Sequence, residues 1–155
     1  RISEDYKGKE LLVVGVLKGS VIFAAELIKN ITIPCQIDFM AVSSYGDSSE
    51  TTGVVRILKD LDSEISGKHI IIVEDIVDSG ITLNYLSNYL KSRNASSVEI
   101  VSLLTKPSTR KVDIDCKYVG FETPDEFLVG YGLDYAEKYR NLPFVGILKR
   151  EVYEK

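Results

Sequence analysis

The sequence predicts an α/β domain in which a parallel sheet is covered by helices on both faces. Three continuous apolar runs recur along the chain, at Leu11–Leu17, Ile70–Val73 and Val98–Leu104. Runs of this kind are typical of strands buried on both faces. Segments with helical spacing lie between them, and this alternation of strand and helix favours a parallel sheet.

The first part of the chain supplies a helix and a further strand after the first apolar run. Ser20–Asn30 places Phe23, Leu27 and Ile28 on one helical face. Cys35–Val42 is expected to add the next strand. Both elements fit the predicted order of a strand followed by a crossover helix and another strand.

The polar segment Ser43–Gly53 is predicted to be a long loop between two strand-like segments. Loops of this length are often active-site lids, although composition alone fits a disordered connector equally well. Tyr45 is its only large ring, so little apolar burial is available to hold the loop in place. We expect it to be mobile when no ligand is bound.

The second part of the chain contains the helix Ile81–Ser92 between two of the apolar runs. Leu86, Tyr89 and Leu90 share one face of this helix. No repeat and no sharp shift in composition divides the chain, so residues 1–155 are expected to form one domain. The chain starts at Arg1 without an initiator methionine, and we expect that a native N-terminal segment is missing.

Composition excludes several classes of protein. The 155 residues carry a formal net charge of −4, which does not favour a surface for nucleic acid. The apolar runs are far shorter than the roughly 20 residues that span a bilayer. The two cysteines are too few for a disulfide framework, which favours a reduced, cytoplasmic setting. We therefore expect neither a nucleic-acid partner nor a membrane segment.

The segment from Ile72 to Thr82 carries the strongest chemical signal. A strand is followed by the acids Glu74 and Asp75 and then by a turn of small and polar residues that opens a helix. In open parallel sheets ligands bind beyond the carboxyl ends of the strands, where the two acids are expected to emerge. Backbone N–H groups at a helix start bind phosphate, and Gly80 permits close approach. The segment predicts a phosphate cradle beside two carboxylates, suited to a phosphorylated sugar with magnesium.

This segment also has simpler interpretations. Asp78 and Ser79 could act only as a helix N-cap, but capping does not explain paired acids at the end of a buried strand. The sequence contains no G-x-x-x-x-G-K-[ST] loop and no G-x-G-x-x-G motif after the first strand. These absences argue against nucleoside-triphosphate hydrolysis and dinucleotide binding.

The segment Val73–Thr82 resembles the phosphoribosyl pyrophosphate signature of the type I phosphoribosyltransferases. Residues 17–20, 106–110, 119–131 and 133–140 are similar, in order and spacing, to the hypoxanthine-guanine branch of that family. The downstream segments are the more specific, since the signature is shared by enzymes that use other bases. The resemblance covers essentially the whole chain, and it implies the type I phosphoribosyltransferase fold with a small hood over the purine.

The resemblance implies a role for each matching position in binding the phosphoribosyl group. Asp78 is the catalytic acid or base facing the purine ring nitrogen. The 5-phosphate is held by the turn, and the ribose hydroxyls and magnesium by the two acids. In full, the implied phosphoribosyl site comprises Glu74, Asp75, Asp78, Ser79, Gly80, Ile81 and Thr82.

The remaining roles implied by the resemblance concern pyrophosphate, the purine and the lid. Pyrophosphate is bound by Lys18, Gly19 and Arg140, and the lid contains Ser44 and Tyr45. Lys106 donates to the 6-oxo group and Phe127 stacks on the ring. The purine site is Lys106, Phe127, Leu128 and Asp134, and the implied metal ligands are Glu74, Asp75 and Asp134.

Taken singly, several of these residues have simpler interpretations. Phe127 is an ordinary core aromatic, Lys18 a charge at a strand end, and Asp134 with Arg140 a surface ion pair of little energetic value. Their joint occurrence in family order favours the functional interpretation. The chain departs from the family before the first strand, where only residues 1–9 remain.

The implied activity is magnesium-dependent transfer of the 5-phosphoribosyl group from phosphoribosyl pyrophosphate to hypoxanthine or guanine. The products are IMP or GMP and pyrophosphate, and the assembly is a homodimer or homotetramer. Two alternatives stay open. One is a non-enzymatic regulator that senses phosphoribosyl pyrophosphate, and the other is a related transferase that prefers xanthine or a pyrimidine.

Overall fold

A computed structural model describes residues 1–44 and 55–154 of the chain. The helices and strands follow one another in the order α1 (Ile2–Asp5), β1 (Leu11–Leu17), α2 (Val21–Lys29), β2 (Cys35–Ser44), β3 (Val55–Lys59), β4 (His69–Val77), α3 (Ile81–Ser92), β5 (Ser97–Thr105), a 3₁₀ turn (Pro107–Thr109), β6 (Tyr118–Glu122), β7 (Leu128–Val129), β8 (Gly146–Ile147) and α4 (Arg150–Tyr153).

The central sheet has the strand order β3-β2-β1-β4-β5-β6. The strands β2, β1, β4, β5 and β6 pair in parallel, which confirms the predicted parallel sheet. The edge strand β3 pairs antiparallel with β2. The two strands therefore run in opposite directions at this edge of the sheet.

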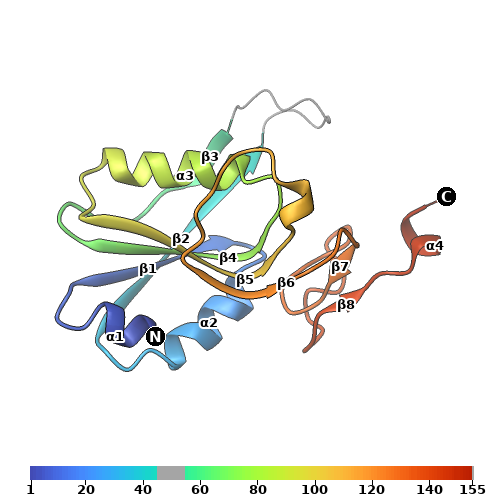
Figure 1. Ribbon diagram of the computed structural model, residues 1–155, viewed down its shortest axis with the longest axis horizontal. Helices are drawn as coiled ribbons and strands as arrows, with labels where there is room; N and C mark the ends of the chain where they lie inside the picture. The colour runs from blue at the N-terminus through green and yellow to red at the C-terminus, as the bar shows by residue number, and fades with distance from the viewer. Residues whose placement is uncertain (45–54, 155) are drawn as a thin grey trace.

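Helices cover both faces of this sheet, as Figure 1 shows with α3 on one side and α1 and α2 on the other. The face under α3 buries Leu83, Leu86 and Leu90 against the apolar side chains of the strands. The opposite face buries Ala24 of α2 and Ile2 of α1, with Phe23 and Leu27 packed against the same cluster. The predicted apolar faces of both long helices are therefore the buried ones.

Two strands extend further than the sequence predicts. β2 continues to Ser44 and β4 continues to Val77, whereas the apolar run of β4 ends at Val73. Glu74 and Asp75 therefore lie inside β4, and the expectation that they emerge beyond its end is wrong. The strand continues because its pairing with β5 does, with Glu74 opposite Ser102 and Val77 opposite Thr105.

We call residues 123–154 the hood. It stands beside the end of the sheet at which β4 gives way to α3, and it carries the small antiparallel pair of β7 with β8 (Figure 1). Within the hood, the short helix α4 is connected to the segment before it, because the Tyr135 hydroxyl donates to the carbonyl of Val152. None of the helices described in residues 1–44 and 55–154 has the length and apolar character needed to cross a membrane.

Candidate active site

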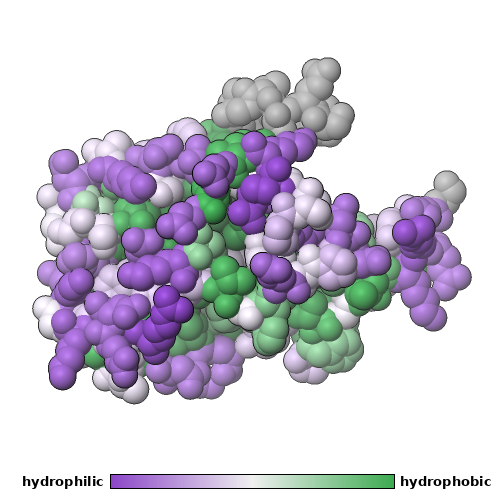
Figure 2. Space-filling view, viewed as in Figure 1, coloured by the Kyte–Doolittle hydropathy of each residue, from purple (hydrophilic) through white to green (hydrophobic). Residues whose placement is uncertain are grey.

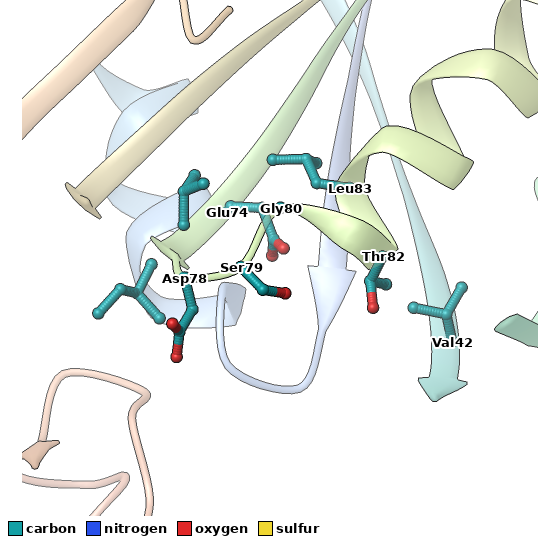
Figure 3. A pocket seen from close by; sticks show the side chains of 9 residues that line it. Val42, Glu74, Asp78, Ser79, Gly80, Thr82 and Leu83 are labelled. Atoms are coloured by element: carbon teal, nitrogen blue, oxygen red, sulfur yellow. The ribbon is translucent and has the colours of Figure 1, made fainter. Parts of the chain in front are cut away.

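A pocket of about 250 Å³ opens where β4 ends and α3 begins. Figure 3 shows the oxygen-bearing side chains of Glu74, Asp78, Ser79 and Thr82 on the same side of the turn. All but one of the lining residues come from a single stretch of chain; the lining consists of Val42, Glu74, Ile76, Val77, Asp78, Ser79, Gly80, Thr82 and Leu83. The structure thus brings together most of the predicted phosphoribosyl site, whereas Asp75 and Ile81 do not line the pocket.

The turn at the bottom of this pocket is held by the segment that follows β5. Gly80 is the N-terminal cap residue of α3 and has a φ of 86°, in the left-handed region that glycine tolerates. The backbone N–H groups of Lys111 and Val112 donate to the carbonyl of Ser79. Arg110 Nε donates to the carbonyl of Asp78 at 3.1 Å. Because Gly80 occupies the cap position, Asp78 is not the N-cap of α3, whereas Ser79 Oγ accepts a long hydrogen bond from the Ile81 N–H at 3.4 Å.

The two acids of β4 lie on opposite faces of the sheet because successive strand residues alternate. Glu74 lines the pocket, and burial together with the nearby Asp75 carboxylate raises its pKa well above the ordinary value. Burial also raises the pKa of Asp75, although a bond from the Ile76 N–H and the Arg140 guanidinium act in the opposite direction. The two acids therefore have different neighbours, although they are adjacent in the sequence.

The turn after β1 lies directly against Asp75. A Cβ atom added to Gly19 would overlap the Asp75 carboxylate, and one added to Gly132 would overlap the carbonyl of Gly19. The peptide bond between Leu17 and Lys18 is cis. Lack of a side chain at both glycines thus lets the β1 turn sit between the β4 acid and the hood.

Charged side chains gather where this turn meets the hood. Lys18 Nζ lies 2.9 Å from Glu137 Oε1, and Arg140 Nε donates to Glu137 Oε2 at 2.9 Å. Arg140 Nη2 is 3.5 Å from Asp134 Oδ1. Hydrogen bonds from Lys18 and Arg140 lower the pKa of Glu137. The structure therefore joins the predicted pyrophosphate cations Lys18 and Arg140 through a carboxylate that the sequence reasoning did not select.

The predicted purine-binding residues lie around the start of the hood. The backbone N–H of Lys106 donates to the carbonyl of Val77, which fixes Lys106 beside the end of β4. Its Nζ lies 3.7 Å from Asp125 Oδ1, and its side chain is only 12% exposed. Leu128 pairs with Ile147 in the small sheet of the hood. These contacts hold both positions by backbone hydrogen bonds.

Phe127 belongs to an aromatic cluster within the hood. Its ring meets Tyr135 edge-on at a centroid distance of 5.6 Å and Tyr153 of α4 at 4.8 Å. The ring is only half-buried. Phe127 is therefore held by two rings while part of the residue stays exposed to solvent.

The sequence did not single out four residues that contact the predicted site residues. They are Arg110, which bonds the turn at Asp78, and Asp125, Glu137 and Tyr153. Each acts through a partner distant in the sequence or on another element, so local spacing carries no signal for it. Of the lid, Ser44 ends β2, and Tyr45 lies outside the described residues. The lid prediction stays a prediction.

The pocket is formed by a turn of small residues at the end of a sheet strand, and a hood with basic and aromatic side chains faces it. This arrangement is typical of the phosphoribosyltransferases. The family model of the phosphoribosyl transferase domain matches residues 1–136. The chain belongs to this family.

Relatives place the chain within the hypoxanthine-guanine branch. It is 56% identical to the hypoxanthine-guanine phosphoribosyltransferase of Staphylococcus epidermidis, over 99% of this chain and 86% of the relative. It is 54% identical to the enzyme of that name from Bacillus subtilis, over 99% of this chain and 85% of the relative. A crystal structure of a hypoxanthine phosphoribosyltransferase from Staphylococcus aureus has a TM-score of 0.97 and 55% identity, covering 99% of this chain and 84% of that one.

Proposed function

We propose that this chain transfers the 5-phosphoribosyl group of phosphoribosyl pyrophosphate to hypoxanthine or guanine, releasing pyrophosphate and forming IMP or GMP. The observation that carries the proposal is the pocket at the end of β4, in which Glu74 and the turn from Asp78 to Thr82 meet. The names of the relatives support the choice of a 6-oxopurine. This activity is a step of purine salvage.

The turn of the pocket accounts for binding of the 5-phosphate. Ser79 and Thr82 supply hydroxyl groups, and the start of α3 adds the positive end of a helix dipole. Glu74 lies across the same pocket, where a carboxylate accepts hydrogen bonds from ribose hydroxyls. Asp78 is exposed at the mouth of the pocket, free to exchange a proton with a purine nitrogen.

Charge separation determines what the other residues do during transfer. Breaking the bond from the anomeric carbon to pyrophosphate builds positive charge on the ribose and negative charge on the leaving group. Lys18 and Arg140 stabilise the leaving group, where the planar guanidinium suits paired oxygens. Lys106 donates to the 6-oxo group while Phe127 and the backbone of Leu128 hold the ring. Water must be excluded, because hydrolysis is the competing reaction.

The acidic residues fit a magnesium ion that is shared with the substrate. Within residues 1–44 and 55–154, no group of three acidic, histidine or cysteine side chains forms a complete metal cage. Magnesium usually binds one or two carboxylates together with water and substrate phosphates. Asp75 and Asp134 influence each other electrostatically, and we propose that they hold this ion. Glu74 lies on the opposite face of the sheet, so we propose that it meets magnesium only together with the ribose hydroxyls of the substrate. When bound, the ion neutralises charge on the pyrophosphate.

We also propose that the chain assembles as a homodimer or homotetramer in the cytoplasm. Apolar side chains gather on the surface over β6 and the hood (Figure 2). Phe121 is 66% exposed and Phe144 is 58% exposed. Large exposed apolar side chains commonly mark an interface, and we assign these to contact with a second copy of the chain. Light scattering coupled to gel filtration measures the mass.

A pyrophosphate-release assay with a panel of bases tests the function. We expect release with hypoxanthine and guanine, far less with adenine and uracil, and loss of activity in excess EDTA that magnesium restores. If xanthine gave the highest kcat/KM of the bases tested, xanthine would be the preferred substrate in place of hypoxanthine or guanine. Binding of phosphoribosyl pyrophosphate without release for any base would instead favour the sensing regulator.

A further inference from the structure

The carboxylate of Glu137 lies between the two cations assigned to pyrophosphate. It is 2.9 Å from Lys18 Nζ through one oxygen and 2.8 Å from Arg140 Nη2 through the other. Lys18 follows β1, whereas Glu137 and Arg140 belong to the hood, so this one side chain links two separate parts of the site. Glu137 thus occupies both cations with the same chemical group, an anionic oxygen, that a diphosphate offers.

The backbone around Glu137 is built to present this side chain. Glu137 has a φ of 66°, and Ala136 and Tyr139 also have positive φ values, of 51° and 78°. Non-glycine residues adopt this left-handed region only at an energetic cost. Such conformations persist where their surroundings enforce them, and here the Glu137 N–H donates to Asp134 Oδ2 at 2.9 Å. The segment therefore fixes the backbone of Glu137 beside the cations, so that its side chain reaches them.

The contact is also weak enough to exchange. The side chains of Lys18 and Glu137 are 68% and 58% exposed. Ion pairs with this exposure contribute little net stability, because water screens them and two long side chains lose freedom. A pyrophosphate group carries several negative charges and binds both cations at once, so it can displace a single carboxylate.

Resting on the proposed function, we propose that Glu137 is a built-in counter-ion that holds Lys18 and Arg140 in the ligand-free chain and competes with pyrophosphate for them. Competition lowers the affinity for pyrophosphate and for the diphosphate end of the substrate. It also favours departure of the product, since the carboxylate returns to the cations as pyrophosphate leaves. Glu137 is in this sense a residue that sets affinity without touching the reacting atoms.

Glu137→Gln tests the competition because it removes the charge and keeps the shape. Titration calorimetry of the full chain with inorganic pyrophosphate and magnesium measures the affinity directly. We expect about three- to ten-fold tighter binding, the size expected from loss of one or two exposed charge contacts. The matched control is Glu151→Gln on α4, which makes the same charge change at an exposed position outside the cluster. It should leave the affinity unchanged.

A double-mutant cycle separates competition for the cations from a general charge effect. In a Lys18→Met background, Glu137→Gln should tighten pyrophosphate binding by clearly less than it does in the wild type. Equal or weaker binding by Glu137→Gln than by the wild type would overturn the inference alone, since it would make Glu137 an aid to the cations. No pyrophosphate binding by either protein would overturn the proposed function as well.

Discussion

The pocket turn and the hood are built in different ways. The turn follows one strand and precedes one helix, so nearly all of its pocket comes from residues 74–83. The hood holds its functional side chains by contacts between distant segments, such as Lys18 with Glu137, which are 119 residues apart. A site assembled from consecutive residues on rigid elements leaves a sequence signature, whereas one assembled by tertiary contact leaves only scattered residue types.

The difference also separates two tasks. The turn is anchored to the buried sheet, since Val73 and Val77 on β4 are 0% and 2% exposed. The hood has a two-stranded sheet and exposed ion pairs, with Asp125 68% exposed. We therefore expect damage to the turn to affect the phosphoribosyl step for every base, and damage around Lys106 and Phe127, on the purine side of the hood, to affect the choice and affinity of the base.

Asp78→Asn provides the largest expected effect in the turn. Loss of general acid–base catalysis should lower kcat by roughly 10²- to 10⁴-fold for hypoxanthine and guanine alike. Stopped-flow or steady-state assays of pyrophosphate release measure it, and the affinity for phosphoribosyl pyrophosphate should change much less. An Asn variant with near wild-type turnover would remove Asp78 from the mechanism.

Gly80→Ala tests whether the turn is as rigid as its contacts indicate. A Cβ atom there would lie 3.2 Å from the carbonyl oxygen of Val112 and 3.0 Å from Ile114, in addition to the left-handed φ. We expect a loss of about 2–4 kcal/mol in the free energy of unfolding, from backbone strain and overpacking together. The matched control is Gly67→Ala, with a φ of 81° and no neighbouring atom within 4 Å. Equal losses in urea unfolding would show that crowding at Gly80 is unimportant.

Lys106→Ala should affect the hood side in a base-selective manner. Loss of a charge-assisted hydrogen bond to the 6-oxo group should weaken 6-oxopurines by about 1.5–3 kcal/mol and narrow discrimination against adenine. Ratios of kcat/KM for hypoxanthine, guanine and adenine provide the measurement. Equal losses for all three bases would assign Lys106 a structural role only, through its contacts with Val77 and Asp125.

Tyr153→Ala should have the smallest effect, because Tyr153 acts through Phe127. An aromatic pair contributes about 0.5–1.5 kcal/mol beyond its buried area, so the KM for the base should rise about two- to ten-fold. The KM for phosphoribosyl pyrophosphate should stay constant, and Tyr153→Phe should restore the base affinity. A parallel rise in both KM values would show that α4 supports the whole hood and not the stacking ring.

Particular elements show how far the sequence could lead. An apolar run predicted the strand β1 and helical spacing predicted the helix α3, both with the bounds that the structure has. Burial on both faces and a 3.6-residue period each leave a direct pattern in the sequence. The end of β4 could not be found in this way. The last residues of β4 include two acids, so the hydrophobic pattern of a buried strand stops before the strand does. Pairing with β5 extends the strand, and the sequence does not show that pairing.

By itself the sequence determined the α/β sheet and predicted a phosphate turn, since both depend on local periodicity or on neighbours along the chain. The candidate residues outside that turn came from the resemblance to the phosphoribosyltransferases. Only the tertiary structure decided that Glu74 and Asp75 face different surroundings, that Phe127 rests on Tyr153, and that Glu137 joins Lys18 to Arg140. The physical reason is that ion pairs and ring contacts depend on distances in space. The path of the chain through the hood sets those distances, and spacing in the sequence does not record them.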